Sequence, residues 1–116
     1  MPAQDCIFCK IVAGEIKGER LFDDDQVIAI RDINPQAPVH ILVISREHIE
    51  SLIRLPSEKA PILGHMSAVG NELARHEGLW PKGYRLVINA GPDGGQSVPH
   101  LHLHLLGGRP MRWPPG

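Results

Sequence analysis

The run HLHLHLL at residues 100–106 constrains the fold of this chain more than any other feature. Successive side chains of a β-strand point to opposite faces of a sheet. A strand here places three imidazoles on one face and three leucines on the other: His100, His102 and His104 against Leu101, Leu103 and Leu105. We expect the leucines to face a core and the histidines not to.

The remaining segments predict an α+β fold. Apolar periodicity and turn residues indicate a short N-terminal helix over 6–16 that Gly14 ends, a long helix over about 57–77, and further strands over 20–24, 27–32, 39–44 and 84–90. In the long helix, Ser57 is the expected N-cap, Pro61 is tolerable only near the start, and Gly78 ends the helix. This order predicts an antiparallel sheet of about five strands with the long helix on one face.

Composition narrows the function classes. The 116 residues predict a single domain over 1–116, with 107–116 as a C-terminal tail. The formal net charge of −1, with no basic block, argues against nucleic acid as a partner. No apolar run reaches the ~20 residues of a membrane span, and the first residues lack the pattern of a signal peptide. We therefore expect no membrane partner and a cytoplasmic location.

The two cysteines, Cys6 and Cys9, form a C-x-x-C pair close to the N-terminus. A disulfide framework is excluded because the chain has no other thiol. Two functional interpretations stay open, a redox pair or half of a zinc site, and the alternative is a pair of inert thiols. The position at the N-terminus favours the zinc half-site, because thioredoxin-type pairs follow a strand of a βαβ unit.

The three alternating histidines have a structural interpretation as a polar outer face and two functional ones. His-x-His can supply two ligands to a metal, and a row of imidazoles can supply a nucleophile and an acid or base from one rigid element. The preceding loop favours the second, because Gly91, Gly94 and Gly95 can take positive φ and form an anion-binding nest. Gln96 and Ser97 add donors beside it.

Together these motifs resemble the histidine triad (HIT) nucleotide-binding protein family, and within it the purine nucleoside phosphoramidases. The resemblance covers nearly the whole chain and rests on CIFCKI, DINPQAPVHILVI, GYRLVINAGPDGGQSVPHLHLHLLGGR and the closing WPPG. It implies a twofold homodimer that hydrolyses purine nucleoside 5′-phosphoramidates, of the adenosine 5′-monophosphoramidase type. The reaction would pass through a covalent nucleotidyl-histidine and need no cofactor.

Carried onto this sequence, the resemblance assigns His102 as the nucleophile. The carbonyl of His100 would hold one ring nitrogen of His102 and leave the other free to attack phosphorus. His104, with His40 alongside, would fix and protonate groups around the phosphate, and Ser97 would donate to the phosphate or the departing amine.

The same resemblance implies a site for an AMP-like purine nucleotide. Asp32 would bind the ribose hydroxyls and Asn89 would line the phosphate site, together with Gly95, Gln96, Ser97 and His104. Aliphatic and aromatic walls would come from Ile7, Phe8, Ile11, Ile16, Ile30, Ile33 and Leu42. The sequence departs from the family at Ile30, where an aromatic is common, and Pro99 has no amide donor.

Some microbial members of the family hold zinc with a C-x-x-C pair and two histidines. The matching residues here are Cys6, Cys9, His48 and His100, which would form a closed Cys₂His₂ structural site. A bound ion would orient His100 beside the nucleophile.

The resemblance also implies that the tail reaches across the dimer. Trp113 would contact the partner chain near its substrate, and Arg112 would bring a positive charge close to the leaving group. Two other functions stay open: a dinucleoside polyphosphate hydrolase or nucleotidyl transferase that uses the same His102 intermediate, and a nucleotide-sensing interaction protein without enzymatic activity.

Overall fold

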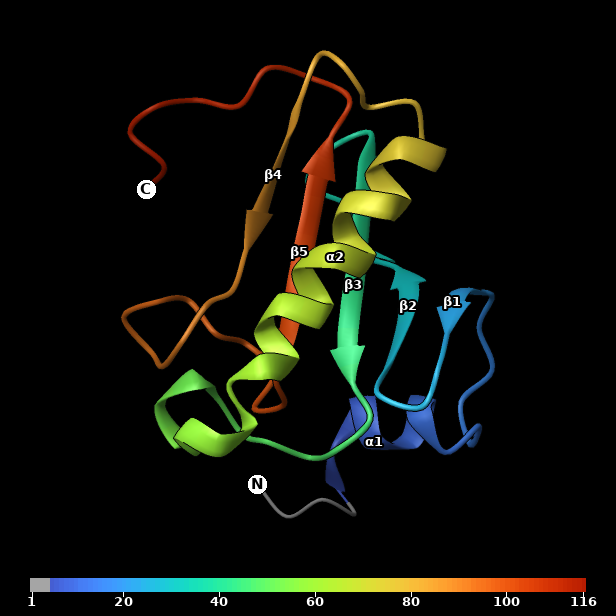
Figure 1. The fold of residues 1–116 in the computed structure, drawn as a ribbon, viewed down its shortest axis with the longest axis vertical. Helices are drawn as coiled ribbons and strands as arrows, with labels where there is room; N and C mark the ends of the chain where they lie inside the picture. The colour runs from blue at the N-terminus through green and yellow to red at the C-terminus, as the bar shows by residue number, and fades with distance from the viewer. Residues whose placement is uncertain (1–4) are drawn as a thin grey trace.

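The computed structural model describes residues 5–116 and confirms the predicted α+β fold. Five strands form one antiparallel sheet in the order β1-β2-β3-β5-β4 (Figure 1). The strands are β1 (Arg20–Asp23), β2 (Val27–Arg31), β3 (Val39–Ser45), β4 (Tyr84–Val87) and β5 (His102–Gly107). A short helix α1 (Ile7–Val12) precedes the sheet, and the long helix α2 (Pro61–His76) lies between β3 and β4.

Helix α2 covers one face of the sheet. Its buried stripe comprises Met66, Val69, Gly70, Leu73 and Ala74, which pack in one core with Leu101, Leu103 and Leu105. A Cβ atom at Gly70 would lie 3.2 Å from Leu86 and 3.3 Å from Leu103, so the missing side chain lets the helix approach the sheet closely. The prediction that the leucines of the histidine run face a core is confirmed.

The start of the long helix differs from the expectation. Residues Ser57–Lys59 form a separate 3₁₀ turn, and Ser57 caps neither it nor α2. Helix α2 begins at Pro61, because proline fits the first turn of a helix, where its missing N–H costs no hydrogen bond. Gly78, with φ of 76°, follows the helix end as predicted.

The histidine face of the sheet is also covered, and the expectation that it lies away from a core is wrong. Cys6 and Phe8, at the start of α1, pack there with Ile28, Leu42 and Ile44 in a second buried cluster. The register places Leu42 opposite His104 and Ile44 opposite His102, so these side chains share one face. Burial follows because α1 folds back over this face.

The largest departures from the predicted strand bounds are at the end of β4 and the start of β5. Strand β4 ends at Val87 rather than at residue 90, and β5 begins at His102 rather than His100. The amide of His100 donates to the carbonyl of Val98 at 2.8 Å instead of joining the ladder. His100 therefore belongs to the loop that leads into β5.

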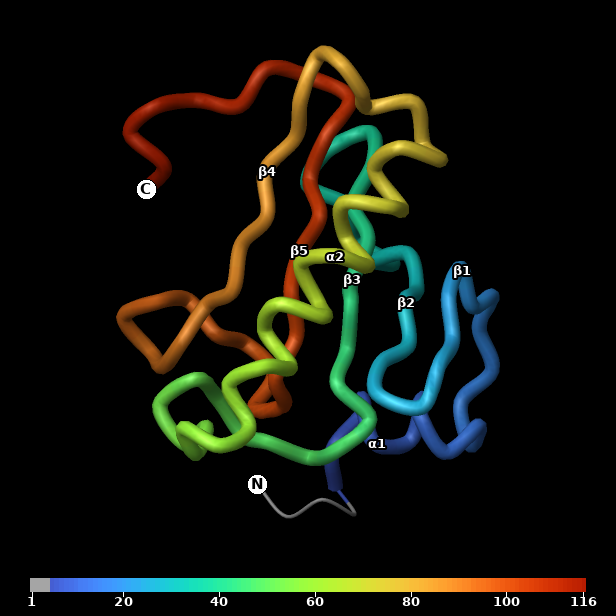
Figure 2. The backbone as a smooth tube through the Cα atoms, viewed as in Figure 1, coloured from blue at the N-terminus to red at the C-terminus, as the bar shows by residue number. Residues whose placement is uncertain are grey.

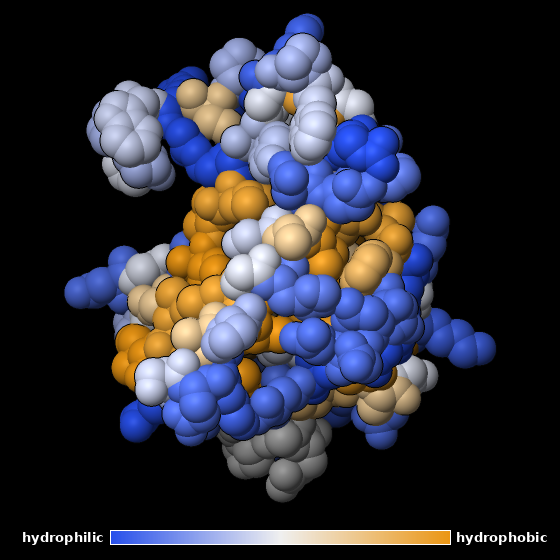
Figure 3. All heavy atoms as spheres, in the orientation of Figure 1, coloured by the Kyte–Doolittle hydropathy of each residue, from blue (hydrophilic) through white to orange (hydrophobic). Residues whose placement is uncertain are grey.

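The tail after β5 leaves the sheet and runs out past β4 (Figure 2). Within the described chain, β4 pairs only with β5 and so forms one edge of the sheet. Figure 3 shows hydrophobic side chains gathered on the surface over β4 and the neighbouring part of α2. Among residues 5–116, no helix has the length and apolar character needed to cross a membrane.

Candidate active site and metal centre

Main-chain carbonyls hold two of the three histidines of the run. His102 Nδ1 lies 2.6 Å from the carbonyl oxygen of His100, and His100 Nε2 lies 2.6 Å from that of Ser45. A carbonyl only accepts, so each of these ring nitrogens carries the proton and donates it. In the neutral imidazoles, Nε2 of His102 and Nδ1 of His100 are therefore left with free lone pairs.

His102 combines a free lone pair with a dry environment. Its side chain is 5% exposed, and the ring of Phe8 packs edge-on against it with centroids 4.9 Å apart. Burial lowers the pKa of His102 below its ordinary value, because the charged imidazolium is poorly solvated there. The neutral, nucleophilic form is thus favoured near neutral pH.

His40 and His104 form a second imidazole pair on the same face. His40 Nε2 lies 2.9 Å from His104 Nδ1 and 3.5 Å from a carboxylate oxygen of Asp32. Burial lowers the pKa of His104 to about 4, helped by repulsion from His102 and His40. The pKa of His40 is also lowered by burial, against an opposing effect of the Asp32 charge. The ring centroids of His102 and His104 are 5.0 Å apart, so the pair adjoins His102.

The glycine-rich loop before β5 is held by its own hydrogen bonds. Gly91 and Gly95 have positive φ, and a Cβ atom at Gly94 would lie 2.4 Å from the carbonyl oxygen of Ala90. The Gln96 side chain accepts from the Gly91 amide and donates to two main-chain carbonyls. The amides of Gly95 and Gln96 bond to carbonyls within the loop, which differs from the expected open nest. Ser97 is exposed at the end of this loop.

The expected nucleotide-lining residues fall into three groups by burial. Phe8 and Leu42 are buried, whereas Ile11, Ile30, Asp32 and Asn89 are partly buried. Three more are exposed: Ile7, Ile16 and Ile33. Asp32 accepts from the amide of Asn34 at 2.8 Å through one oxygen, while the other faces His40. Ile30 and Leu42 are paired across β2 and β3, so their side chains lie on the same face of the sheet.

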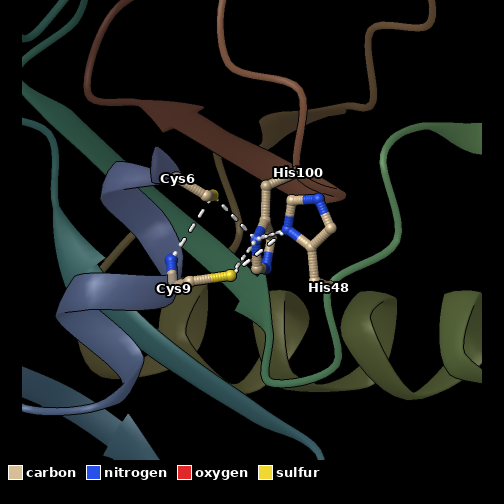
Figure 4. A group of neighbouring side chains, drawn as sticks. All are labelled: Cys6, Cys9, His48 and His100. Carbon is tan, nitrogen blue, oxygen red and sulfur yellow. Dashed lines mark hydrogen bonds between the residues drawn. The ribbon is translucent and has the colours of Figure 1, made fainter. Parts of the chain in front are cut away.

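Four potential metal ligands converge at the N-terminal end of α1 (Figure 4). Cys6 Sγ lies 3.2 Å from His100 Nδ1, and Cys9 Sγ lies 3.2 Å from His48 Nδ1 and 3.5 Å from His100 Nδ1. The two Nδ1 atoms are 3.2 Å apart. Burial raises the pKa of the Cys9 thiol to about 11, with the neighbouring Cys6 adding to the effect.

These distances fit a tetrahedral zinc ion. Zinc bonds of about 2.3 Å to sulfur and about 2.05 Å to nitrogen imply edges of roughly 3.5 Å between sulfur and nitrogen and roughly 3.3 Å between nitrogens. The lone pair of His100 Nδ1 already faces both sulfurs, because Ser45 holds the opposite nitrogen. His48 faces Cys9 and His100 through Nδ1, whereas its buried Nε2 has no hydrogen-bond partner among the described residues.

The fold and the arrangement of histidines define a histidine triad protein. A family model described as the HIT domain matches residues 13–111, and the chain belongs to this family. It is similar to a "14 kDa zinc-binding protein" from Zea mays, at 49% identity over 95% of this chain and 87% of the relative.

Two solved structures show the same similarity. A HIT family hydrolase from Legionella pneumophila Philadelphia 1 has a TM-score of 0.93 and 47% identity, with 97% of this chain and 100% of that chain covered. A Zn-bound histidine triad family protein from Mycobacterium smegmatis has a TM-score of 0.80 and 35% identity, with 93% of this chain and 78% of that chain covered.

The structure thus brings together the triad, His40, Asp32 and the four cysteine and histidine ligands. It leaves Trp113 82% exposed on the tail. Sequence reasoning missed two groups that hold site histidines, the Ser45 carbonyl and the Gln36 amide. Both act through the main chain, so their residue types carried no signal.

Proposed function

We propose that this protein hydrolyses purine nucleoside 5′-phosphoramidates through a nucleotidyl intermediate on His102. The observation that carries the proposal is the 2.6 Å hydrogen bond from His102 Nδ1 to the His100 carbonyl, which leaves Nε2 unprotonated in a buried ring beside the imidazole of His104. In the first step, His102 Nε2 attacks the α-phosphorus, the P–N bond breaks, and the nitrogen takes up a proton from solvent and leaves as the amine. Water then attacks the same phosphorus, the bond to Nε2 breaks, and the nucleoside monophosphate is released.

The neighbouring groups support this chemistry in distinct ways. His104 adjoins His102 and donates hydrogen bonds to the phosphoryl oxygens, and Ser97 adds a hydroxyl donor from the preceding loop. Asp32 offers carboxylate oxygens for the ribose hydroxyls. Gly95, Gln96 and Asn89 shape the phosphate end, and the apolar residues on and facing α1 accommodate the purine.

Turnover of an adenosine phosphoramidate by the purified protein tests the proposal. We expect release of AMP and amine, with faster hydrolysis than of a diadenosine polyphosphate. His102→Ala should lose turnover yet keep AMP binding, because the ring is needed for the covalent step more than for ground-state contacts. His76→Ala, on the exposed side of α2, is the matched control.

Each outcome separates a competing function. Faster hydrolysis of the dinucleotide would instead favour the polyphosphate hydrolase. Nucleotide binding without any turnover would favour a sensing protein, and unchanged turnover of His102→Ala would contradict the mechanism.

We also propose a structural zinc ion held by Cys6, Cys9, His48 and His100. The zinc-binding relative, the Zn-bound neighbour and the converging ligand atoms support it. When bound, the ion would fix the His100 ring, and the His100 carbonyl in turn orients His102.

Metal analysis of protein purified without added metal tests the zinc site. We expect about one zinc per chain, and the double variant Cys6→Ser, Cys9→Ser should lose the metal and melt at a lower temperature. Metal-free native protein with the same melting temperature as the variant would refute the site.

A further inference from the structure

The loop between β2 and β3 contacts the candidate active site through the main chain of Gln36. The Gln36 amide donates to His40 Nδ1 at 3.0 Å, and the Gln36 carbonyl accepts from Arg109 Nη2 at 3.0 Å. The Gln36 side chain points elsewhere and donates to the carbonyl of Asn34. Gln36 is therefore held between His40, in the site, and Arg109, at the root of the tail.

Close packing of the same two segments supports this contact independently. Gly108 has a φ of 92°, and a Cβ atom there would lie 2.8 Å from Pro38. The segment after β5 and the loop before β3 thus touch at two neighbouring points. The Arg109 hydrogen bond is therefore one of two contacts between these segments.

The amide of Gln36 decides which nitrogen of His40 carries the proton. An N–H group only donates, so His40 Nδ1 must accept and be unprotonated. In the neutral ring, the proton then sits on Nε2, which lies 2.9 Å from His104 Nδ1. His40 is 5% exposed, and this burial favours the neutral ring.

The hydrogen bond from His40 also determines which nitrogen of His104 carries the proton. Because His104 Nδ1 accepts from His40, the neutral His104 ring carries its proton on Nε2 and presents a donor. A pair of neutral imidazoles can also point the opposite way, with protons on His40 Nδ1 and His104 Nδ1. That arrangement would turn His104 Nε2 into an acceptor, which repels a phosphoryl oxygen, and the Gln36 amide excludes it.

We propose that Gln36, through its main-chain N–H, and Arg109, through its bond to the Gln36 carbonyl, are positioning residues that hold His104 as a hydrogen-bond donor to the substrate phosphate. The tautomer of the His40–His104 pair follows from the geometry alone. The catalytic consequence rests on the proposed function. The position of Arg109, where the tail begins, is thereby coupled to the protonation of His104 Nε2.

Ring nitrogen NMR of protein labelled with ¹⁵N-histidine tests the tautomers without any substrate, because protonated and unprotonated ring nitrogens have different shifts. In the native protein near pH 7, we expect protons on Nε2 of both His40 and His104. Gln36→Pro removes the amide donor and should give mixed or reversed tautomers. Gln36→Ala keeps the amide and is the matched control, with native tautomers.

Arg109→Ala provides a second variant in case proline at position 36 prevents folding. It should shift part of the His40 and His104 population to the reversed tautomer, whereas Arg75→Ala, which removes an exposed arginine of α2, should not. Native tautomers in Arg109→Ala, and in Gln36→Pro where it folds, would overturn the proposal even if both variants are less stable.

Kinetics then connect the tautomer to turnover. Loss of one preorganised donor costs on the order of 10²–10³ in rate, so Gln36→Pro should lower kcat by up to about 10² with little change in KM. A full native kcat beside reversed tautomers would refute the donor role of His104. If the tautomers shift but the native protein hydrolyses no phosphoramidate, the proposed function fails and the positioning by Gln36 stands.

Discussion

Replacement of Phe8 by alanine should loosen the packing of α1 on the histidine face of the sheet and greatly lower the free energy of unfolding. Phe8 is 6% exposed and is the one buried residue within α1. Its ring packs edge-on against His102 and His100, with centroids 4.9 and 5.8 Å apart.

The magnitude follows from burial and ring contacts. Truncation of a buried phenylalanine to alanine typically costs about 3–5 kcal/mol, and edge-to-face ring pairs contribute about 0.5–1.5 kcal/mol each within such totals. For a domain of this size, we expect Phe8→Ala to lower the free energy of unfolding by about 3–5 kcal/mol. Phe8→Leu keeps most of the volume and should cost about 1.5 kcal/mol or less.

Urea denaturation followed by circular dichroism measures both changes. Ile7→Ala is the matched control, because Ile7 is the preceding residue of the same helix and is 49% exposed. It should cost under about 1 kcal/mol, while its expected place beside the nucleotide predicts a higher KM. A loss below about 1 kcal/mol for Phe8→Ala would refute the reasoning, since the histidine face would then be covered by something other than α1.

Three further predictions concern the donor loop, pH and the tail. Ser97→Ala should lower the rate by about 10² with a poor amine leaving group, and an unchanged rate would leave Ser97 as a loop residue only. Because burial lowers the pKa of His104 from 6.5 to about 4, the unfolded chain binds the extra proton between these values. The contribution of His104 is therefore complete above about pH 6.5 and is lost as the pH falls towards 4, so urea midpoints should fall less with acid in His104→Gln than in the native protein. Deletion of residues 110–116 should change selectivity among amine leaving groups, and we expect size-exclusion chromatography to show a dimer both with and without these residues. Native selectivity after the deletion would make the tail a simple terminus.

The sequence predicted the fold well because its periodicities are local. Alternation in residues 101–106 and the apolar stripe of α2 each require only neighbours in the chain, and both elements form. The errors lie where distant segments meet. Nothing local to the histidine run shows that α1 folds back onto it. Strand β5 also begins two residues late, at His102, because the amides of His100 and Leu101 bond to the carbonyls of Val98 and Ile49.

The site shows the same division at finer scale. Residue types in the run identify the candidate nucleophile, because three imidazoles on alternate positions are hard to explain as ordinary surface. The protonated nitrogen of each ring is set instead by main-chain groups of His100, Ser45 and Gln36. A main-chain carbonyl or amide looks identical in every residue, so this information exists only after folding.

Contacts on the two sides of the site therefore set opposite protonation at Nε2 of the adjacent rings His102 and His104. On one side, the cysteine and histidine cluster contacts His100, whose carbonyl leaves His102 Nε2 with the free lone pair that the proposed nucleophile needs. On the other, the tail root and the loop at Gln36 hold His40, which makes His104 Nε2 a donor. The nucleophile needs a free lone pair and the phosphate needs a proton donor, so neighbouring rings must adopt opposite polarity at Nε2. Identical side chains reach opposite polarity because a carbonyl meets Nδ1 of His102, whereas a ring N–H meets Nδ1 of His104.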